Sequence, residues 1–247
     1  MSGHSKWSQI KHKKAVKDAR RGKLFTGILK EITVAARLGG GDSDGNARLR
    51  TAIAEAKANA VPADNIERAI KKGTGELAGG VIEEVVYEGY GPGGVAILVE
   101  CATDNKNRTV SEVRHLFAKH GGNLGESGCV GWMFSKRGYF LIDPRTTDEE
   151  RFIELALAVG ALDFATDEEG HELFTAPDDF AATVEELERR GIRAAAQELA
   201  MIPQSYVEVA DAKAAQALRL LEALEDHDDV QKAWANLQLP AAALAPH

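Results

Sequence analysis

The stretch "RGYFLIDPRTTDEERFIELALAVGALDFATDEEGHELFTAPDDFAATVEELERRGIRAAAQELAMI", residues 137–202, decides the fold class of this chain. An apolar run at 139–142 predicts a strand, and the apolar spacing over 149–159 predicts a helix. A hairpin over 162–175 is followed by a second helix over 180–190 and by a last strand. This order of elements is β-α-β-β-α-β, which is the split-βαβ or ferredoxin-like pattern.

The segments on either side predict a second domain that the first one interrupts. Residues 95–134 predict a strand, a helix and a strand, and residues 205–237 predict the same order again. Neither half has a partner of its own, so we expect the two halves to join. The sequence therefore predicts an α+β fold with three domains: a basic N-terminal helical domain (1–76), a discontinuous middle α/β domain (80–135 plus 204–240) and an inserted α/β domain (136–203).

Residues 14–73 predict a bundle of three short amphipathic helices. The first ends at "GGG" (39–41), the second is the alanine-rich "NARLRTAIAEAKANA" (46–60), and the third runs from "VPAD" (61–64) to Gly73. The first helix is expected to turn an apolar stripe towards the bundle core, made of Leu24, Phe25, Ile28, Leu29, Ile32, Ala35 and Ala36.

Charge is divided unevenly along the chain. Residues 1–72 hold sixteen Lys and Arg against seven Asp and Glu, a balance of +9. Residues 73–247 hold fourteen against thirty-one, a balance of −17, so the whole chain carries −8. Such asymmetry favours a basic module that meets a polyanion, attached to an acidic body. The alternative is a basic terminus that only improves solubility.

The cationic segment, residues 6–23, carries eight Lys and Arg and one acid. Lys13, Lys14, Lys17 and Arg21 lie on the same side of a helix as the apolar stripe that follows. Because burying unpaired cations is costly, this segment is expected to project beyond the bundle as a helical extension or a tail. Lys and Arg would neutralise phosphates, and Trp7 would either stack on a base or hold the segment on the bundle.

The lysine-rich mixture is typical of backbone recognition rather than of base readout. The predicted nucleic-acid-binding residues are Lys6, Trp7, Lys11, His12, Lys13, Lys14, Lys17, Arg20, Arg21 and Lys23.

Composition excludes several classes of protein. No apolar run approaches the length of a membrane span, and no apolar core follows the basic N-terminus as in a secretory signal. Cys101 and Cys129 are too few for a disulfide scaffold and too far apart for a zinc knuckle, so they are expected to be buried thiols in a reducing cytoplasm.

Three further motifs share some features with known ligand sites. "GYGPGG" (89–94) lacks the Lys-Ser/Thr of a phosphate loop and predicts a hairpin turn. "GGGDSDG" (39–45) lacks the acids of a calcium loop and predicts a helix linker, with Asp44 or Asn46 as the N-cap. "EDHDD" (225–229) allows a metal site but favours a solvated acidic turn. No catalytic motif stands out, so we expect neither an enzyme nor a cofactor.

Four stretches carry a resemblance to a known family: "MSGHSKWSQIKHKKAVKDARRGKLF", "ANAVPADNIERAIKKGTG", "YEGYGPGGVAILVECATDNKNRTVSEVRHLFAKHGGNLGESGCVGWMF" and "LEDHDDVQKAWANL". They closely resemble the YebC family over nearly the whole length, apart from the C-terminal "QLPAAALAPH". The resemblance implies a cytoplasmic protein with a helical bundle and two α/β domains, one inserted in the other. It also implies either a transcriptional regulator that binds DNA or a ribosome-associated factor that helps difficult sequences such as proline runs.

The sequence therefore predicts a non-enzymatic regulator of gene expression that binds nucleic acid through its basic N-terminus. DNA and ribosomal RNA compete as the target, and the ribosome is a candidate partner; no membrane and no small-molecule substrate are expected. A protein-interaction adaptor and an enzyme with a cleft between the α/β domains are the alternatives from other classes.

Overall fold

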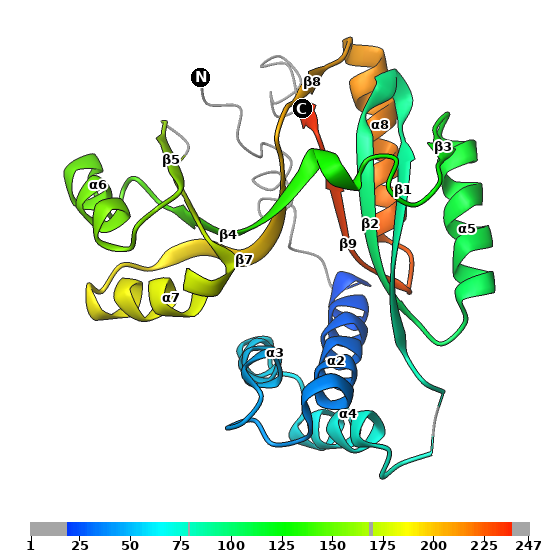
Figure 1. Ribbon diagram of the computed structural model, residues 1–247, viewed down its shortest axis with the longest axis horizontal. Coiled ribbons are helices and arrows are strands. Elements are labelled where there is room, and N and C mark those ends of the chain that lie inside the picture. The colour runs from blue at the N-terminus through cyan, green and yellow to red at the C-terminus, as the bar shows by residue number, and fades with distance from the viewer. Residues whose placement is uncertain (1–18, 79, 168–169, 239–247) are drawn as a thin grey trace. The chain divides into compact units, whose positions relative to one another are not determined.

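A computed structural model describes residues 19–78, 80–167 and 170–238 (Figure 1). Among these residues the chain forms two compact units. One unit holds residues 19–131 and 209–235, and the other holds residues 132–208 and 236–238. None of the described helices combines the length and the apolar character needed to cross a lipid bilayer.

The first unit begins with the predicted bundle, made of α2 (Ala19–Gly39), α3 (Ala47–Ala58) and α4 (Ala63–Thr74). Asn46 is the N-cap of α3, because its side chain accepts the backbone N–H of Leu49 at 3.1 Å. This confirms the predicted helix linker. Leu24, expected inside, is 43% exposed instead. The bundle core is Ile28, Ile32, Ala35, Ala36, Leu49, Ala52, Ala56, Val61, Ile66 and Ala69.

A four-stranded sheet with the order β3-β1-β2-β9 forms the α/β body of the same unit. Helix α5 packs against β1, α8 packs against β9, and the two helices contact each other (Figure 1). The sequence "GYGPGG" joins β1 to β2 as the predicted hairpin turn. The body comprises β1 (Glu83–Tyr90), β2 (Ala96–Thr103), α5 (Lys106–Lys119), β3 (Asn123–Leu124), α8 (Asp211–Glu225) and β9 (Val230–Ala235).

Two strand predictions were wrong. The stretch "CVGWMF" (129–134), the predicted last strand of residues 95–134, is not a strand before Phe134, because the buried carboxylate of Glu88 accepts the backbone N–H groups of Gly128, Val130 and Gly131 at 2.6–2.8 Å. Donors taken by a side chain cannot form a sheet ladder. The tail strand predicted at 205–209 does not join the body sheet either. It is only β8 (Val207–Glu208), which pairs in parallel with β10 (Leu237–Gln238).

The second unit carries a four-stranded antiparallel sheet with the order β5-β6-β4-β7 and two helices (Figure 1). This order places the first and third strands of the unit at the centre, as the split-βαβ pattern requires. Phe140, Ile142 and Phe152 contribute to the core between the sheet and the helices. The elements are β4 (Phe134–Ile142), α6 (Glu149–Ala158), β5 (Asp163–Thr166), β6 (His171–Thr175), α7 (Phe180–Arg189) and β7 (Ala194–Pro203). The predicted α+β fold class is confirmed.

Candidate nucleic-acid interface and the acidic turn

The predicted nucleic-acid-binding residues lie mostly outside the described residues. Lys6, Trp7, Lys11, His12, Lys13, Lys14 and Lys17 precede the first described position. Arg20 and Arg21 belong to the first turn of α2, and Lys23 is the first of the set whose side chain is described. A binding role for these ten residues therefore stays a prediction.

Lys23 does not project into solvent. Its side chain is half-buried, and its Nζ atom has no hydrogen-bond partner among the described residues. Burial lowers the pKa of Lys23 to about 8, while the nearby carboxylates of Asp226, Glu225 and Asp228 act in the opposite direction and favour the charged form. These carboxylates belong to the acidic turn, residues 225–229, which follows α8. The base of the cationic segment therefore faces acids of the same chain.

Lys30, two helical turns after Lys23 on α2, is held by the same turn. Its Nζ atom donates to the carboxylate of Asp229 at 2.8 Å and to the carbonyl oxygens of Asp228 at 2.8 Å and Ala102 at 3.1 Å. An ammonium group has three donors, so Lys30 is saturated within the protein. This contact joins the helical bundle to the α/β body.

Asp229 is the centre of the contact and is only 5% exposed. Its second oxygen, Oδ2, accepts from Arg108 at 2.7 Å and from the hydroxyl groups of Thr109 at 2.8 Å and Thr103 at 3.2 Å. Burial alone would raise the pKa of Asp229, but the hydrogen bonds from Arg108, Lys30 and Thr109 hold it well below its ordinary value. Asp229 therefore stays ionised and is shared by two cations.

The prediction of a solvated acidic turn is thus wrong for Asp229, although Asp226 and Asp228 are exposed as expected. The physical reason is that a carboxylate with two cations and two hydroxyl donors no longer needs water. Lys30 lies 199 positions away in the chain, so no local pattern in "EDHDD" could reveal the partner.

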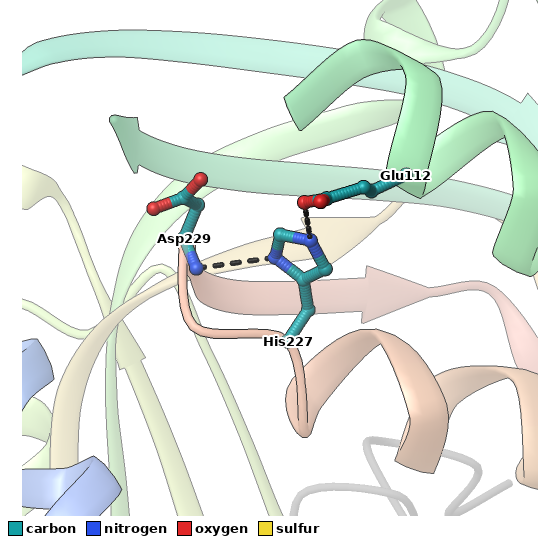
Figure 2. A group of neighbouring side chains, drawn as sticks. All are labelled: Glu112, His227 and Asp229. Carbon is teal, nitrogen blue, oxygen red and sulfur yellow. Dashed lines mark hydrogen bonds and ion pairs between the residues drawn. The ribbon is translucent and has the colours of Figure 1, made fainter. Parts of the chain in front are cut away.

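His227 connects this turn to α5 (Figure 2). Its Nδ1 atom accepts the backbone N–H of Asp229 at 3.1 Å, and its Nε2 atom lies 2.8 Å from a carboxylate oxygen of Glu112. Because Nδ1 is an acceptor, the proton of the neutral ring is on Nε2, which donates to Glu112. Both ring nitrogens are therefore occupied.

Glu112, His227 and Asp229 offer ligand atoms within 4.8 Å of one another, which raises the question of a metal site. The chemistry of these donors does not fit one. A metal ion binds a ring nitrogen that carries no proton. In His227 that nitrogen is Nδ1, which already accepts the backbone N–H of Asp229, and Nε2 carries the proton. Asp229 is also already neutralised by Lys30 and Arg108, which would repel an added cation. The cluster is an internal hydrogen-bond network.

A cavity of about 980 Å³ opens beside this network. Its lining has an excess of acids over cations, and both cations nearest to Asp229 are already paired with it. Such a lining disfavours phosphate groups. The charged residues that line the cavity are Lys30, Lys72 and Arg108 against Asp104, Glu112, Asp226, Asp228 and Asp229.

Helix α4 gives little support to base-specific recognition. Lys71 is paired with Glu67 on the same helix at 2.6 Å, and Lys72 faces the acidic cavity. The remaining polar candidates on this helix are Asn65 and the exposed Arg68. A helix that reads bases needs several polar side chains presented together, which α4 does not offer.

Comparisons with known proteins cover nearly the whole chain. The profile of the TACO1/YebC protein N-terminal domain matches residues 5–76, and the profile of the TACO1/YebC second and third domain matches residues 82–237. The chain is also similar in structure to a conserved hypothetical protein from Aquifex aeolicus. That crystal structure has a TM-score of 0.88 and 49% identity, and the match covers 98% of this chain and 100% of the other.

Named relatives from two bacteria are similar over nearly their full length. A "Probable transcriptional regulatory protein" from Syntrophus aciditrophicus is 55% identical, over 97% of this chain and 96% of the relative. A protein of the same description from Geobacter sulfurreducens is also 55% identical over the same shares. The names of these relatives describe regulatory proteins.

Proposed function

Because the chain belongs to the TACO1/YebC family, we propose that it is a regulator of gene expression that binds DNA through its basic N-terminal domain. The proposal takes DNA as the target from the printed names of the relatives, which describe transcriptional regulators.

The observation that carries the proposal is the division of charge. Residues 1–72 have a balance of +9 and residues 73–247 a balance of −17. Lys and Arg bind phosphates and release counterions, whereas an acidic surface repels a polyanion. The N-terminal domain is therefore the part of the chain that favours nucleic acid, and the acidic remainder limits contact to that part.

Recognition is expected to rest on the sugar-phosphate backbone. The basic side chains of α4 are partly engaged within the protein, as the pair between Lys71 and Glu67 illustrates. Backbone contacts position a protein on nucleic acid but carry no sequence information by themselves. Binding should therefore weaken steeply with salt and depend little on base sequence.

Ribosomal RNA is the second candidate target. Two of the four polar side chains that α4 could offer to bases, Lys71 and Lys72, face partners or acids of the protein, which favours recognition of shape, as in proteins that contact structured RNA. Under this alternative the chain would be a translation factor that acts on the ribosome.

One experiment separates the two targets. The variant with Lys13, Lys14, Lys17 and Arg21 changed to Glu is compared with the natural chain for association with duplex DNA and with ribosomes at several salt concentrations. A loss for DNA alone supports the transcriptional regulator, and a loss for ribosomes alone selects the translation factor. Unchanged association with both contradicts the proposal and favours an adaptor that binds proteins.

A matched control carries the same change of charge outside the basic domain. Arg145, Arg151, Arg189 and Arg193 are exposed cations of the second unit, and their joint change to Glu should leave both associations nearly unaltered. Similar losses in the control and in the test variant would show that only net charge matters.

A further inference from the structure

Two cations of α2 point at the acidic turn rather than into solvent. The Nζ atom of Lys30 is saturated by Asp229 and by two backbone carbonyls, and Nζ of Lys23 is buried beside Asp226, Glu225 and Asp228. Lys23 and Lys30 are seven residues apart, so they lie on the same face of the helix.

The surface between these two lysines is also covered. A Cβ atom added to Gly27 would lie 3.6 Å from the side-chain oxygen of Gln231 on β9. This face of α2 therefore packs on the acidic turn and on the strand that follows it. A phosphate could reach Lys30 only by displacing Asp229 from it.

We propose that the acidic turn is an internal competitor for phosphate, which holds Lys23 and Lys30 inside the protein and thereby ends the nucleic-acid interface before Lys23. This inference rests on the proposed function, because it states which cations of the basic domain contact the phosphates. It also gives the acidic turn a role that a solvated loop would not have.

The two lysines differ in how firmly they are held. Lys30 has three short hydrogen bonds, one of them to a buried carboxylate. Lys23 has none among the described residues, and its charged form is favoured only by the nearby carboxylates of Asp226, Glu225 and Asp228, Asp226 first. Removing the charges of Asp226 and Asp228 leaves only Glu225 to offset the burial of Lys23, so its side chain is expected to move to solvent, where it can meet a phosphate.

The test measures the salt dependence of binding to a short mixed-sequence DNA duplex. Each phosphate contact contributes about −0.9 to the slope of log K against log salt concentration. The double variant Asp226→Asn with Asp228→Asn is expected to steepen that slope by about 0.9, which corresponds to one added contact. The same double variant with Lys23→Met should return to the slope of the natural chain.

Asp178→Asn with Asp179→Asn is the matched control. These are two neighbouring exposed acids of the second unit, so the change of charge is the same but no cation of α2 is near them in the chain. A steepening as large as in the test variant would overturn the proposal. So would a gain that persists when Lys23 is absent, because the effect would then be one of net charge.

A chemical footprint tests the sequestration without nucleic acid. The lowered pKa of Lys23 favours the uncharged, reactive amine, but its Nζ atom is buried and closed to the reagent. Reductive methylation read by mass spectrometry should therefore modify Lys23 more slowly than the exposed Lys57 in the natural chain, and no more slowly than Lys57 in the Asp226→Asn, Asp228→Asn variant. Fast modification of Lys23 in the natural chain would overturn the proposal. If the natural chain does not bind DNA, or binds it independently of salt, the proposed function is contradicted. The footprint then still tests whether the acidic turn holds Lys23 inside the protein.

Discussion

Among the described residues, two ionic contacts join the helical bundle to the α/β body, and they differ in burial far more than in distance. In the first, Asp229 accepts from Lys30 at 2.8 Å and from Arg108 at 2.7 Å. In the second, Arg48 of α3 donates to Glu31 of α2 and to Glu84 of β1, each at 2.6 Å. The side chain of Asp229 is 7% exposed, whereas that of Arg48 is 40% exposed.

The difference shows that the nitrogen–oxygen distance is a poor guide to the strength of an ion pair. The pair with the shorter distances lies in solvent, where water and salt screen it and where long side chains lose entropy on being fixed. The carboxylate of Asp229 lies away from water, so its donors cannot be replaced by solvent. We therefore expect the Asp229 contact to stabilise the fold much more than the Arg48 contact.

The largest effect should follow from Asp229→Ala. The change leaves the partly buried ammonium of Lys30 without its carboxylate and removes the acceptor that α5 shares with β2. Breaking such a buried pair costs about 3–5 kcal/mol of unfolding free energy, measurable by urea denaturation. The matched control Asp178→Ala, at an exposed position of the second unit, should cost no more than about 0.5 kcal/mol. Similar losses for the two variants would contradict the argument from burial.

Acid should remove part of the same stabilisation. The pKa of Asp229 in the folded protein is held below its value in the unfolded chain, so the unfolded state binds more protons as pH falls. The stabilisation is complete above the unfolded pKa and is lost as pH falls from about 5 towards the folded pKa. Unfolding free energy measured over this range should fall more steeply in the natural chain than in Asp229→Asn. Parallel curves would exclude Asp229 as the titrating group.

Glu88→Gln tests whether a buried carboxylate needs a cation. Glu88 is 7% exposed and has three backbone N–H donors instead of a cation, and these bonds offset burial and lower its pKa. The amide offers one acceptor oxygen where the carboxylate offers two, so we expect a loss of about 2 kcal/mol in chemical denaturation. Glu83→Gln, on the same strand but paired with Lys106 at the surface, is the control. An unchanged stability in Glu88→Gln would mean that the amide satisfies the loop equally well.

Most of the fold could be predicted because its elements are encoded locally. The apolar spacing of Ile28 and Ile32, the cap at Asn46 and the hairpin at 91–95 are all short-range signals. The strand predicted at 129–134 was wrong because the apolar residues there have a strand-like pattern, while the backbone N–H groups of Val130 and Gly131 donate to Glu88, 42 and 43 positions earlier. A hydrogen bond between a side chain and a loop that is distant in the sequence produces no periodic pattern from which it could be predicted.

The candidate site was less accessible to sequence reasoning. The excess of cations in residues 1–72 is visible by counting, but the packing of Lys23 against the acidic turn is not. Lys23 was predicted to bind phosphate because it belongs to the cationic segment, residues 6–23, which was expected to project. That prediction took no account of the acidic turn, which lies more than 200 positions later in the chain. Electrostatic partners are chosen by the tertiary fold, so charge patterns predict a binding module better than they predict its members.

The smallest effect is expected for Arg48→Met, which tests the exposed contact of the two. Hydrogen bonds to Glu31 and Glu84 raise the pKa of Arg48, yet the three side chains are 35–45% exposed. The change should therefore cost less than about 1 kcal/mol, and raising the salt concentration should shrink the cost further. Lys57→Met, at an exposed position of the same helix, sets the background for losing one cation. A loss comparable to that of Asp229→Ala would mean that bidentate geometry, and not burial, decides how firmly the bundle is held on the body.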